Sequence, residues 1–420
     1  MATTRADPGQ PKTKGRRPVF AALAAVAALA FSFHAFTIVF DALFASRNPA
    51  LAARVTDSAE AKVGLWQIAS AREADNFARG EIRNFAVSAV LGDPLNAGAL
   101  RALGYHEDHL GNYDEARRLA RLAQDITRRD ELNQLLLARL SARDGDVGAA
   151  MQHLGTALTT SRRAREEIFA LMFPLLRNAE FQDALANQIS ADNDWSVAFL
   201  DRALASPEVD QKDIGRIVLS GRPEEIRPLA DAIGPNLLSA VARRGDAEMV
   251  GSLFALFMPD REGVLEDASL SARTAQPGLG WLGWSPAIGT ASGAELGKTD
   301  TGDFGVLAWS NDAQERTAVL RRVLQLPDGR YALTDRREPT GSSQARFDWI
   351  IQCHGAGKWN ALPMEETNDE TRFTIDADCP MQIIELQTGS ARGNGGGEVV
   401  IDNLAIRRIN PAGEDRQSPT

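Results

Sequence analysis

The chain has 420 residues, of which 44% are hydrophobic and 24% charged, so it can form two or three domains with sizeable cores. Its formal net charge is −10, whereas a general nucleic-acid binder needs clustered Lys and Arg. Composition therefore argues against a non-specific polyanion binder, and we expect no nucleic-acid partner.

The first predicted element is a transmembrane helix. Residues 18–40 form an apolar run whose polar members are Ser32, His34 and Thr37. At ~1.5 Å per residue this run spans the ~30 Å hydrocarbon core, so we predict a membrane anchor over residues 18–43. Lys and Arg cluster in residues 1–17, and the positive-inside rule places this basic tail in the cytoplasm.

A cleaved signal peptide is the alternative, because Ala50-Leu51-Ala52 resembles a small-residue cleavage site. Signal peptides, however, have apolar regions of only ~7–15 residues. We therefore expect a single-pass protein of the bacterial inner membrane, with its N-terminus cytoplasmic and its bulk periplasmic.

Residues 56–257 are predicted to be helical, since Ala, Leu, Arg and Glu follow a 3.6-residue spacing with few β-branched runs. Small and aromatic residues recur within this region. Gly111, Tyr113, Ala116 and Ala123 return 34 residues later as Gly145, Val147, Ala150 and Ala157, and again as Ala179, Phe181, Ala184 and Ala191.

This period, together with Leu103-Gly104 in the first helix and Pro94 ahead of it, resembles the tetratricopeptide repeat over about 130 residues. The resemblance implies an α-helical solenoid with a groove that binds a protein partner. Val147 departs from the pattern by replacing an aromatic residue, and Ala179 by replacing the turn glycine. A generic helical bundle is the alternative. The residues expected to pack the repeats are Gly104, Gly111, Tyr113, Ala116, Gly145, Ala150, Phe181 and Ala184.

Residues 106–109 place two imidazoles and two carboxylates within about one helical turn. A metal site is one interpretation. No further cluster with ligand spacing accompanies these residues, so we predict a solvated helix end instead.

The composition changes near Met258, which predicts a linker over 258–276 and a separate domain over 277–410, followed by a disordered tail over 411–420. Short alternating segments and turn signals predict an antiparallel β-sandwich. Pro327-Asp328-Gly329 predicts a hairpin between two of its strands. The expected strands cover residues 305–310, 317–326, 330–334, 346–353, 371–376, 381–386 and 398–409.

Cys353 and Cys379 are the chain's two cysteines, and both lie in the predicted sandwich. An oxidising compartment would allow them to form a disulfide, which we predict; two buried thiols are the alternative.

The segment 398–409 is similar to the last strand of jelly-roll carbohydrate-binding modules. That resemblance implies a jelly-roll sandwich and makes Asp402 a candidate ligand of a structural calcium ion. Calcium needs six or more oxygen ligands, and the sequence identifies no others.

Five of the seven tryptophans follow residue 276, and exposed indole rings are surfaces on which sugars stack. Alternation along residues 346–353 predicts a buried Trp349. Trp281, Trp284 and Trp359 are the candidate glycan-binding residues, because Gly, Ser or Asn residues flank Trp284 and Trp359 and indicate exposure.

The sequence indicates no catalytic residues. Gly293 to Thr299 is one residue short of a phosphate-binding loop, so we expect a surface loop. The acidic stretch at 365–370 is expected to be solvated. We therefore expect a multidomain α plus β scaffold that binds a protein and a polysaccharide and assists envelope assembly. The alternatives are a pure protein assembly factor and a glycan-cleaving enzyme.

Overall fold

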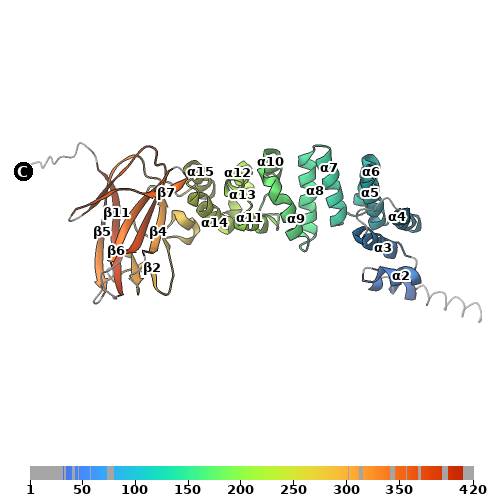
Figure 1. Cartoon of the computed structure of the whole chain (residues 1–420), viewed down its shortest axis with the longest axis horizontal. Helices are drawn as coiled ribbons and strands as arrows, with labels where there is room; N and C mark the ends of the chain where they lie inside the picture. The colour runs from blue at the N-terminus through green and yellow to red at the C-terminus, as the bar shows by residue number, and fades with distance from the viewer. Residues whose placement is uncertain are drawn as a thin grey trace, which may run out of the picture. The chain divides into compact units, whose positions relative to one another are not determined.

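The structure is a computed structural model. Among the residues that it describes, helices predominate as far as Phe257, and antiparallel sheets begin at Ser285 (Figure 1). This confirms the predicted combination of a helical region with antiparallel β-structure. The residues that the structure describes are 32, 35–39, 43–45, 47–56, 58–72, 80–300, 302–311, 316–340, 346–355, 357–367, 370–389 and 396–409.

The predicted basic tail, most of the predicted anchor and the C-terminal tail lie outside the described residues. Within the described part of the chain, no helix has the length and apolar character needed to cross a bilayer.

Contacts divide the chain into two compact units, Met1–Arg162 and Arg163–Thr420. The division falls inside the predicted helical region, and the domain limits given above stay predictions. The first unit contains α2 (Pro49–Val55), α3 (Ala59–Arg72), α4 (Gly80–Gly92), α5 (Ala97–His109), α6 (Tyr113–Ile126), α7 (Glu131–Arg143) and α8 (Val147–Thr160).

The 34-residue period is visible in two helical hairpins of the first unit. Helices α5 and α7 both have 13 residues, and α6 and α8 both have 14. Helix α7 begins 34 residues after α5, and α8 begins 34 residues after α6. Gly111 and Gly145 follow the first helix of each hairpin with φ values of 83° and 81°. Glycine suits this position because a left-handed residue there ends a helix without steric cost.

Small residues allow close contact between these helices. Ala116 and Ala120 are fully buried, and a Cβ at Gly104 would lie only 3.2 Å from Leu136 Cδ2. The guanidinium of Arg143 covers the Tyr113 ring at 3.4 Å from its centroid. The predicted packing residues of these two hairpins therefore lie at helix contacts or at the turns.

The second unit begins with helices that lose this regularity. Pro174 occupies the short 3₁₀ helix that follows α9, and Asn178 caps α10 with an extended backbone, so no left-handed residue is needed at Ala179. Phe181 is buried and Ala184 half-buried. The helices are α9 (Arg165–Met172), η2 (Phe173–Arg177), α10 (Ala179–Ala186), α11 (Ser196–Ala205), α12 (Gln211–Ser220), α13 (Pro223–Ile226), η3 (Arg227–Leu229), α14 (Ala230–Arg243), α15 (Ala247–Phe257) and η4 (Pro277–Leu282).

Two antiparallel sheets follow and enclose an apolar core that includes Trp349. In order, the five-stranded sheet contains β1 (Ser285–Pro286), β4 (Ala318–Leu324), β10 (Gln382–Gly389), β6 (Arg346–Gly355) and β7 (Lys358–Ala361). The six-stranded sheet contains β2 (Ser292–Lys298), β3 (Phe304–Ser310), β11 (Gly397–Ile409), β5 (Gly329–Thr340), β9 (Thr371–Ile375) and β8 (Met364–Glu366).

Two local predictions about this region are wrong. The segment from Gly293 belongs almost entirely to β2 rather than to a loop, because it pairs along its length with β3. The turn at residues 327–329 joins β4 and β5, which lie in different sheets, so it is a crossover and not a hairpin. Strand β4 pairs with β1 and β10, while β5 pairs with β11 and β9.

A buried arginine ties the residues after α15 to the five-stranded sheet. Arg322 is fully buried; its Nε donates to Leu282 O at 2.9 Å and its Nη2 to Val264 O at 2.6 Å. Burial lowers the pKa of Arg322 to about 10, since no water solvates its charge. Residues near both ends of the predicted linker therefore pack against the sandwich.

Candidate functional site

The predicted exposure of Trp284 is wrong. Its side chain is only 3% exposed, its ring lies 5.8 Å from that of Trp349, and its Nε1 donates to Ser269 O at 2.9 Å. Flanking Gly and Ser suggested a loop, but the preceding segment folds over this residue, with Trp284 N donating to Thr274 O. Trp284 is a core residue and not a glycan-binding surface.

Trp281 and Trp359 lie at a contact between α14 and the sheets within the second unit. The Trp281 ring lies 5.1 Å from both the Arg243 and the Arg321 guanidinium carbons, and Trp359 Nε1 donates to Arg243 O at 3.3 Å. Both rings are half-buried. They contribute to an internal contact, which limits their use as a free binding surface.

Trp309 on β3 occupies the outer face of the six-stranded sheet. Val306 and Ala308 are buried in the core, whereas Leu307 and Trp309 point the other way and are half-buried. Strand pairing places Gly293 opposite Trp309. A Cβ at Gly293 would lie 2.5 Å from Trp309 Cζ2, so the indole covers a position where only glycine fits. The strand pairing thus holds an aromatic ring against the sheet surface.

A groove of about 370 Å³ lies on this sheet, and its lining includes Leu307, the next residue along β3 on the same face as Trp309. Strand register aligns Glu295, Leu307, Val400 and Glu338 in one row across β2, β3, β11 and β5. Trp309 belongs to the adjacent row, with Glu398 beside it on β11. The groove, with apolar and acidic residues in its lining, and the adjacent row that holds Trp309 and Glu398 together form the candidate functional site, which we call the Trp309 face.

An ion pair between Asp402 and Arg336 lies further along the same face of β11 and β5. Asp402 is 2% exposed and accepts from Arg336 Nε at 2.7 Å and from Arg336 Nη2 at 2.5 Å. The hydrogen bond from Arg336 to Asp402 raises the pKa of that guanidinium above its usual value. Strand β11 bulges immediately after Asp402, and Asn403 has a φ of 50°, which is uncommon outside glycine.

This arrangement does not favour the predicted calcium site. Both Asp402 carboxylate oxygens accept hydrogen bonds from Arg336. The guanidinium therefore already neutralises the carboxylate that would bind a calcium ion. Within the described ranges, no group of three or more His, Cys, Asp or Glu residues is placed to hold a metal ion.

The predicted disulfide between Cys353 and Cys379 is present. It joins β6 to the turn that precedes β10 in the five-stranded sheet. Its neighbour His354 packs edge-on against Trp359, with ring centroids 5.0 Å apart. The disulfide thus supports the part of the sandwich that contacts α14, and the Trp309 face belongs to the other sheet.

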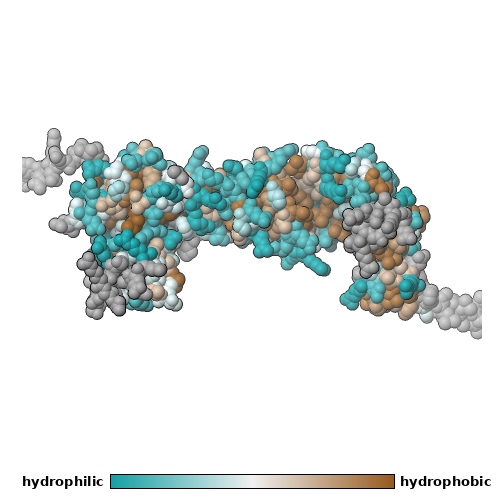
Figure 2. Space-filling model, in the orientation of Figure 1, coloured by the Kyte–Doolittle hydropathy of each residue, from teal (hydrophilic) through white to brown (hydrophobic). Residues whose placement is uncertain are grey.

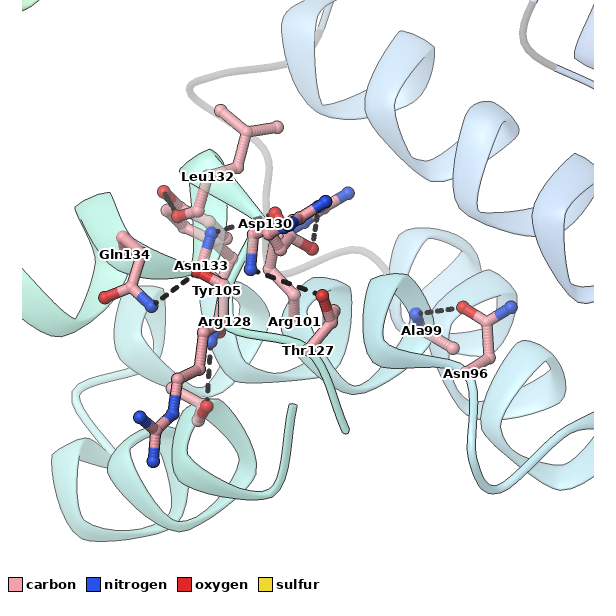
Figure 3. Close-up of polar contacts among 12 residues, drawn as sticks. Asn96, Ala99, Arg101, Tyr105, Thr127, Arg128, Asp130, Leu132, Asn133 and Gln134 are labelled. Atoms are coloured by element: carbon pink, nitrogen blue, oxygen red, sulfur yellow. Dashed lines mark hydrogen bonds and ion pairs between the residues drawn. The ribbon is translucent and has the colours of Figure 1, made fainter. Parts of the chain in front are cut away.

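A second polar cluster links α5 to α7 in the first unit (Figure 3). Arg101 pairs with Asp130, which also caps α7 by accepting from Asn133 N at 3.1 Å. Tyr105 Oη donates to Leu132 O at 2.9 Å, and burial raises the pKa of Tyr105 to about 12. These groups bind one another and the backbone, so the cluster is structural.

The predicted solvated helix end at residues 106–109 is wrong for its first three members. His106, Glu107 and Asp108 are at most 8% exposed. Glu107 accepts from Asn112 Nδ2 at 2.7 Å, and Asp108 lies 3.3 Å from Arg139 Nε. The carboxylates hold the following turn and the neighbouring helix, which the sequence spacing alone did not indicate.

A comparison with known protein families finds no match for this chain, and a comparison with the curated proteins finds none either. The site is therefore interpreted from its own geometry.

Proposed function

We propose that this protein is a membrane-anchored, non-catalytic binding protein of the bacterial envelope that holds a glycan on the Trp309 face. The observation that carries the proposal is the Trp309 ring, which lies over Gly293 beside an open groove. Sugar rings present apolar C–H faces that stack on indoles, while carboxylates such as Glu295 and Glu398 can accept bonds from sugar hydroxyls. An open sheet face suits a chain-like ligand.

We also propose that residues 18–43 anchor the chain in the inner membrane, with the bulk periplasmic. Phe36, Ile38 and Val39, which fall within that range, are 53–58% exposed. Apolar side chains are also exposed over α2 and α3, including Leu51, Val55 and Ile68 (Figure 2). The disulfide supports an oxidising compartment such as the periplasm.

The helical hairpins are proposed to be tetratricopeptide-like and to bind a protein partner, and the sandwich to be a jelly roll. Support for the repeat comes from the matched helix lengths and from the two left-handed glycines 34 residues apart. Such arrays bury their faces against neighbouring units and present extended surfaces to partners.

A pure protein assembly factor is the second candidate. Leu91 and Leu95, at the turn between α4 and α5, are 78% and 75% exposed. Two exposed leucines so close in the chain favour a protein contact at this turn. In that case the Trp309 face would also meet protein, and sugar would play no part.

The test is a glycan array and a polysaccharide pull-down with the oxidised full chain in detergent micelles. We expect specific binding that Trp309→Ala reduces at least about tenfold, because stacked aromatic anchors dominate such contacts. Trp309→Phe should retain part of the binding, and Lys358→Ala, on the exposed edge strand β7, should retain all of it. A folded chain that binds no glycan would replace this proposal with the assembly factor. Glycan binding that is independent of Trp309 would overturn the assignment of the site to the Trp309 face.

A further inference from the structure

The described part of the Trp309 face has an excess of negative charge. The described lining of the groove includes three acidic residues, Glu295, Asp300 and Glu338, and one basic residue, Lys298. Glu398 adds a fourth carboxylate beside Trp309. Glu295 and Glu398 are exposed, and no ion pair of either is found among the described residues.

The nearby arginine does not neutralise this excess. Arg336 uses two of its nitrogens on the buried Asp402, and Nη2 also lies 3.4 Å from Asp303. Its distance to Glu338 is longer, 3.8 Å. Its single charge is therefore shared among three carboxylates, and the groove retains a negative potential that attracts cations.

A negative groove next to an indole selects a particular class of sugar. An ammonium group over the face of a tryptophan gains a cation–π attraction, and its N–H groups donate charge-assisted hydrogen bonds to carboxylates. A uronic acid would bring like charges together on the same surface, which costs free energy at short range. A neutral sugar would gain the stacking contact and hydrogen bonds from its hydroxyls to the carboxylates, but neither the cation–π attraction nor the charge-assisted bonds.

We propose that the Trp309 face binds a glycan that carries protonated amines, such as a polymer of amino sugars without N-acetyl groups. This rests on the glycan-binding function proposed above and adds the chemical class of its ligand. Trp309 would stack one sugar ring, and Glu398 and Glu295 would accept from ammonium groups of that ring and its neighbours along the groove.

The test is calorimetric titration of the oxidised full chain in micelles with three probes of equal length, at a pH where free amines are protonated. The probes are hexamers of glucosamine, of N-acetylglucosamine and of galacturonic acid. We expect the glucosamine hexamer to bind at least about tenfold more tightly than the N-acetylated one, with affinity falling as salt rises, and the galacturonate hexamer to bind weakest.

Matched variants separate local recognition from general attraction to an acidic protein. Glu295→Gln and Glu398→Gln should each weaken the glucosamine hexamer about three- to tenfold and leave the N-acetylated hexamer unchanged. Glu365→Gln removes the same charge from an exposed position on β8, in the same sheet but outside the groove, and should change neither affinity.

The outcomes distinguish the two proposals. Equal, Trp309-dependent binding of the neutral and cationic hexamers would overturn the amine preference and leave glycan binding intact. Glucosamine binding that survives Trp309→Ala, or weakens equally in Glu365→Gln, would show non-specific attraction and overturn the amine preference. Absence of binding for every hexamer would overturn the amine preference, and absence of binding on the glycan array as well would overturn both proposals. A lysine hexapeptide that binds more tightly than the glucosamine hexamer, and depends on Trp309 and Glu398, would replace the amino sugar with a basic protein segment.

Discussion

The α5–α8 hairpins and the six-stranded sheet use their polar side chains differently. In the hairpins, Asp130 pairs with Arg101 and caps α7, and Tyr105 donates to a backbone carbonyl, so these polar groups stabilise the packing of the helices (Figure 3). On the sheet, the half-buried Trp309 and the exposed Glu398 lie side by side on the outer face. The comparison teaches that polar groups paired within a helical repeat contribute to its packing, whereas groups on a sheet face stay accessible. The proposed glycan site therefore lies on the sheet, and the proposed protein partner would contact other surfaces of the repeat.

The sharpest test of this comparison sets a core tryptophan against the one on the sheet surface. Trp284→Ala should lower the free energy of unfolding by about 3–5 kcal/mol, because it empties a buried site in the sandwich core. Trp309→Ala should cost about 1 kcal/mol, since its ring is only half-buried. Denaturant unfolding of both variants measures the difference. Equal losses would show that Trp309 is a structural residue and weaken its role as a binding surface.

The disulfide gives the next largest effect. Replacing both Cys353 and Cys379 with Ser should destabilise the sandwich by about 3.5 kcal/mol, because the bond closes a loop of 26 residues in the unfolded chain. Thermal unfolding with and without a reducing agent measures this loss. The native chain should shift on reduction and the double variant should not. A shift of the double variant would mean that the reducing agent acts elsewhere.

Two helix caps of the first unit differ in their contacts: Asp130 caps α7 and also pairs with Arg101, whereas Asp146 only caps α8. Asp130→Ala should cost about 3 kcal/mol, since it removes the cap of α7 and leaves the largely buried Arg101 without its partner. Asp146→Ala removes only the exposed cap of α8 and should cost about 1 kcal/mol. Urea unfolding followed by circular dichroism tests both. Similar losses would show that the Arg101–Asp130 pair adds nothing beyond capping.

The smallest predicted effect concerns Tyr105. Burial raises its pKa in the folded chain to about 12, while the unfolded phenol ionises near ~10. Above pH ~10 the unfolded state loses its proton first, so the stability contributed by the neutral phenol falls as the pH rises from ~10 to ~12. In an ultraviolet titration, Tyr105→Phe should remove the latest phenol ionisation. It should also cost about 1 kcal/mol at neutral pH through the lost bond to Leu132 O. An unchanged last step would contradict this assignment.

Much of the architecture was predictable because it depends on local pattern. A 3.6-residue spacing indicated the helices, and alternation with turn residues indicated the antiparallel strands. Gly111 and Gly145 indicated two turns through a backbone conformation that glycine adopts freely. Two cysteines in one domain predicted the bond between them. Each of these inferences needs only neighbouring residues or a simple pairing.

The proposed binding face was not predictable in the same way. Alternation along β3 sets Leu307 and Trp309 apart from Val306 and Ala308, but both sets are apolar, so the pattern alone leaves open which set faces the core. The same limit explains Trp284, whose Gly and Ser neighbours indicated exposure although a distant backbone carbonyl binds its indole.

By itself the sequence determined the change from helices to antiparallel strands, the 34-residue spacing of two hairpins and the cysteine pair, because these follow from residue types at short or fixed separations. It did not indicate β1, β2, β7 or β8. The tertiary structure decided which tryptophan lies on the outer sheet face. It also decided that Arg336 pairs with Asp402 and that Arg322 binds the segment after α15 to the sandwich. Those outcomes depend on strand register and on contacts between residues far apart in the chain, which local patterns do not encode.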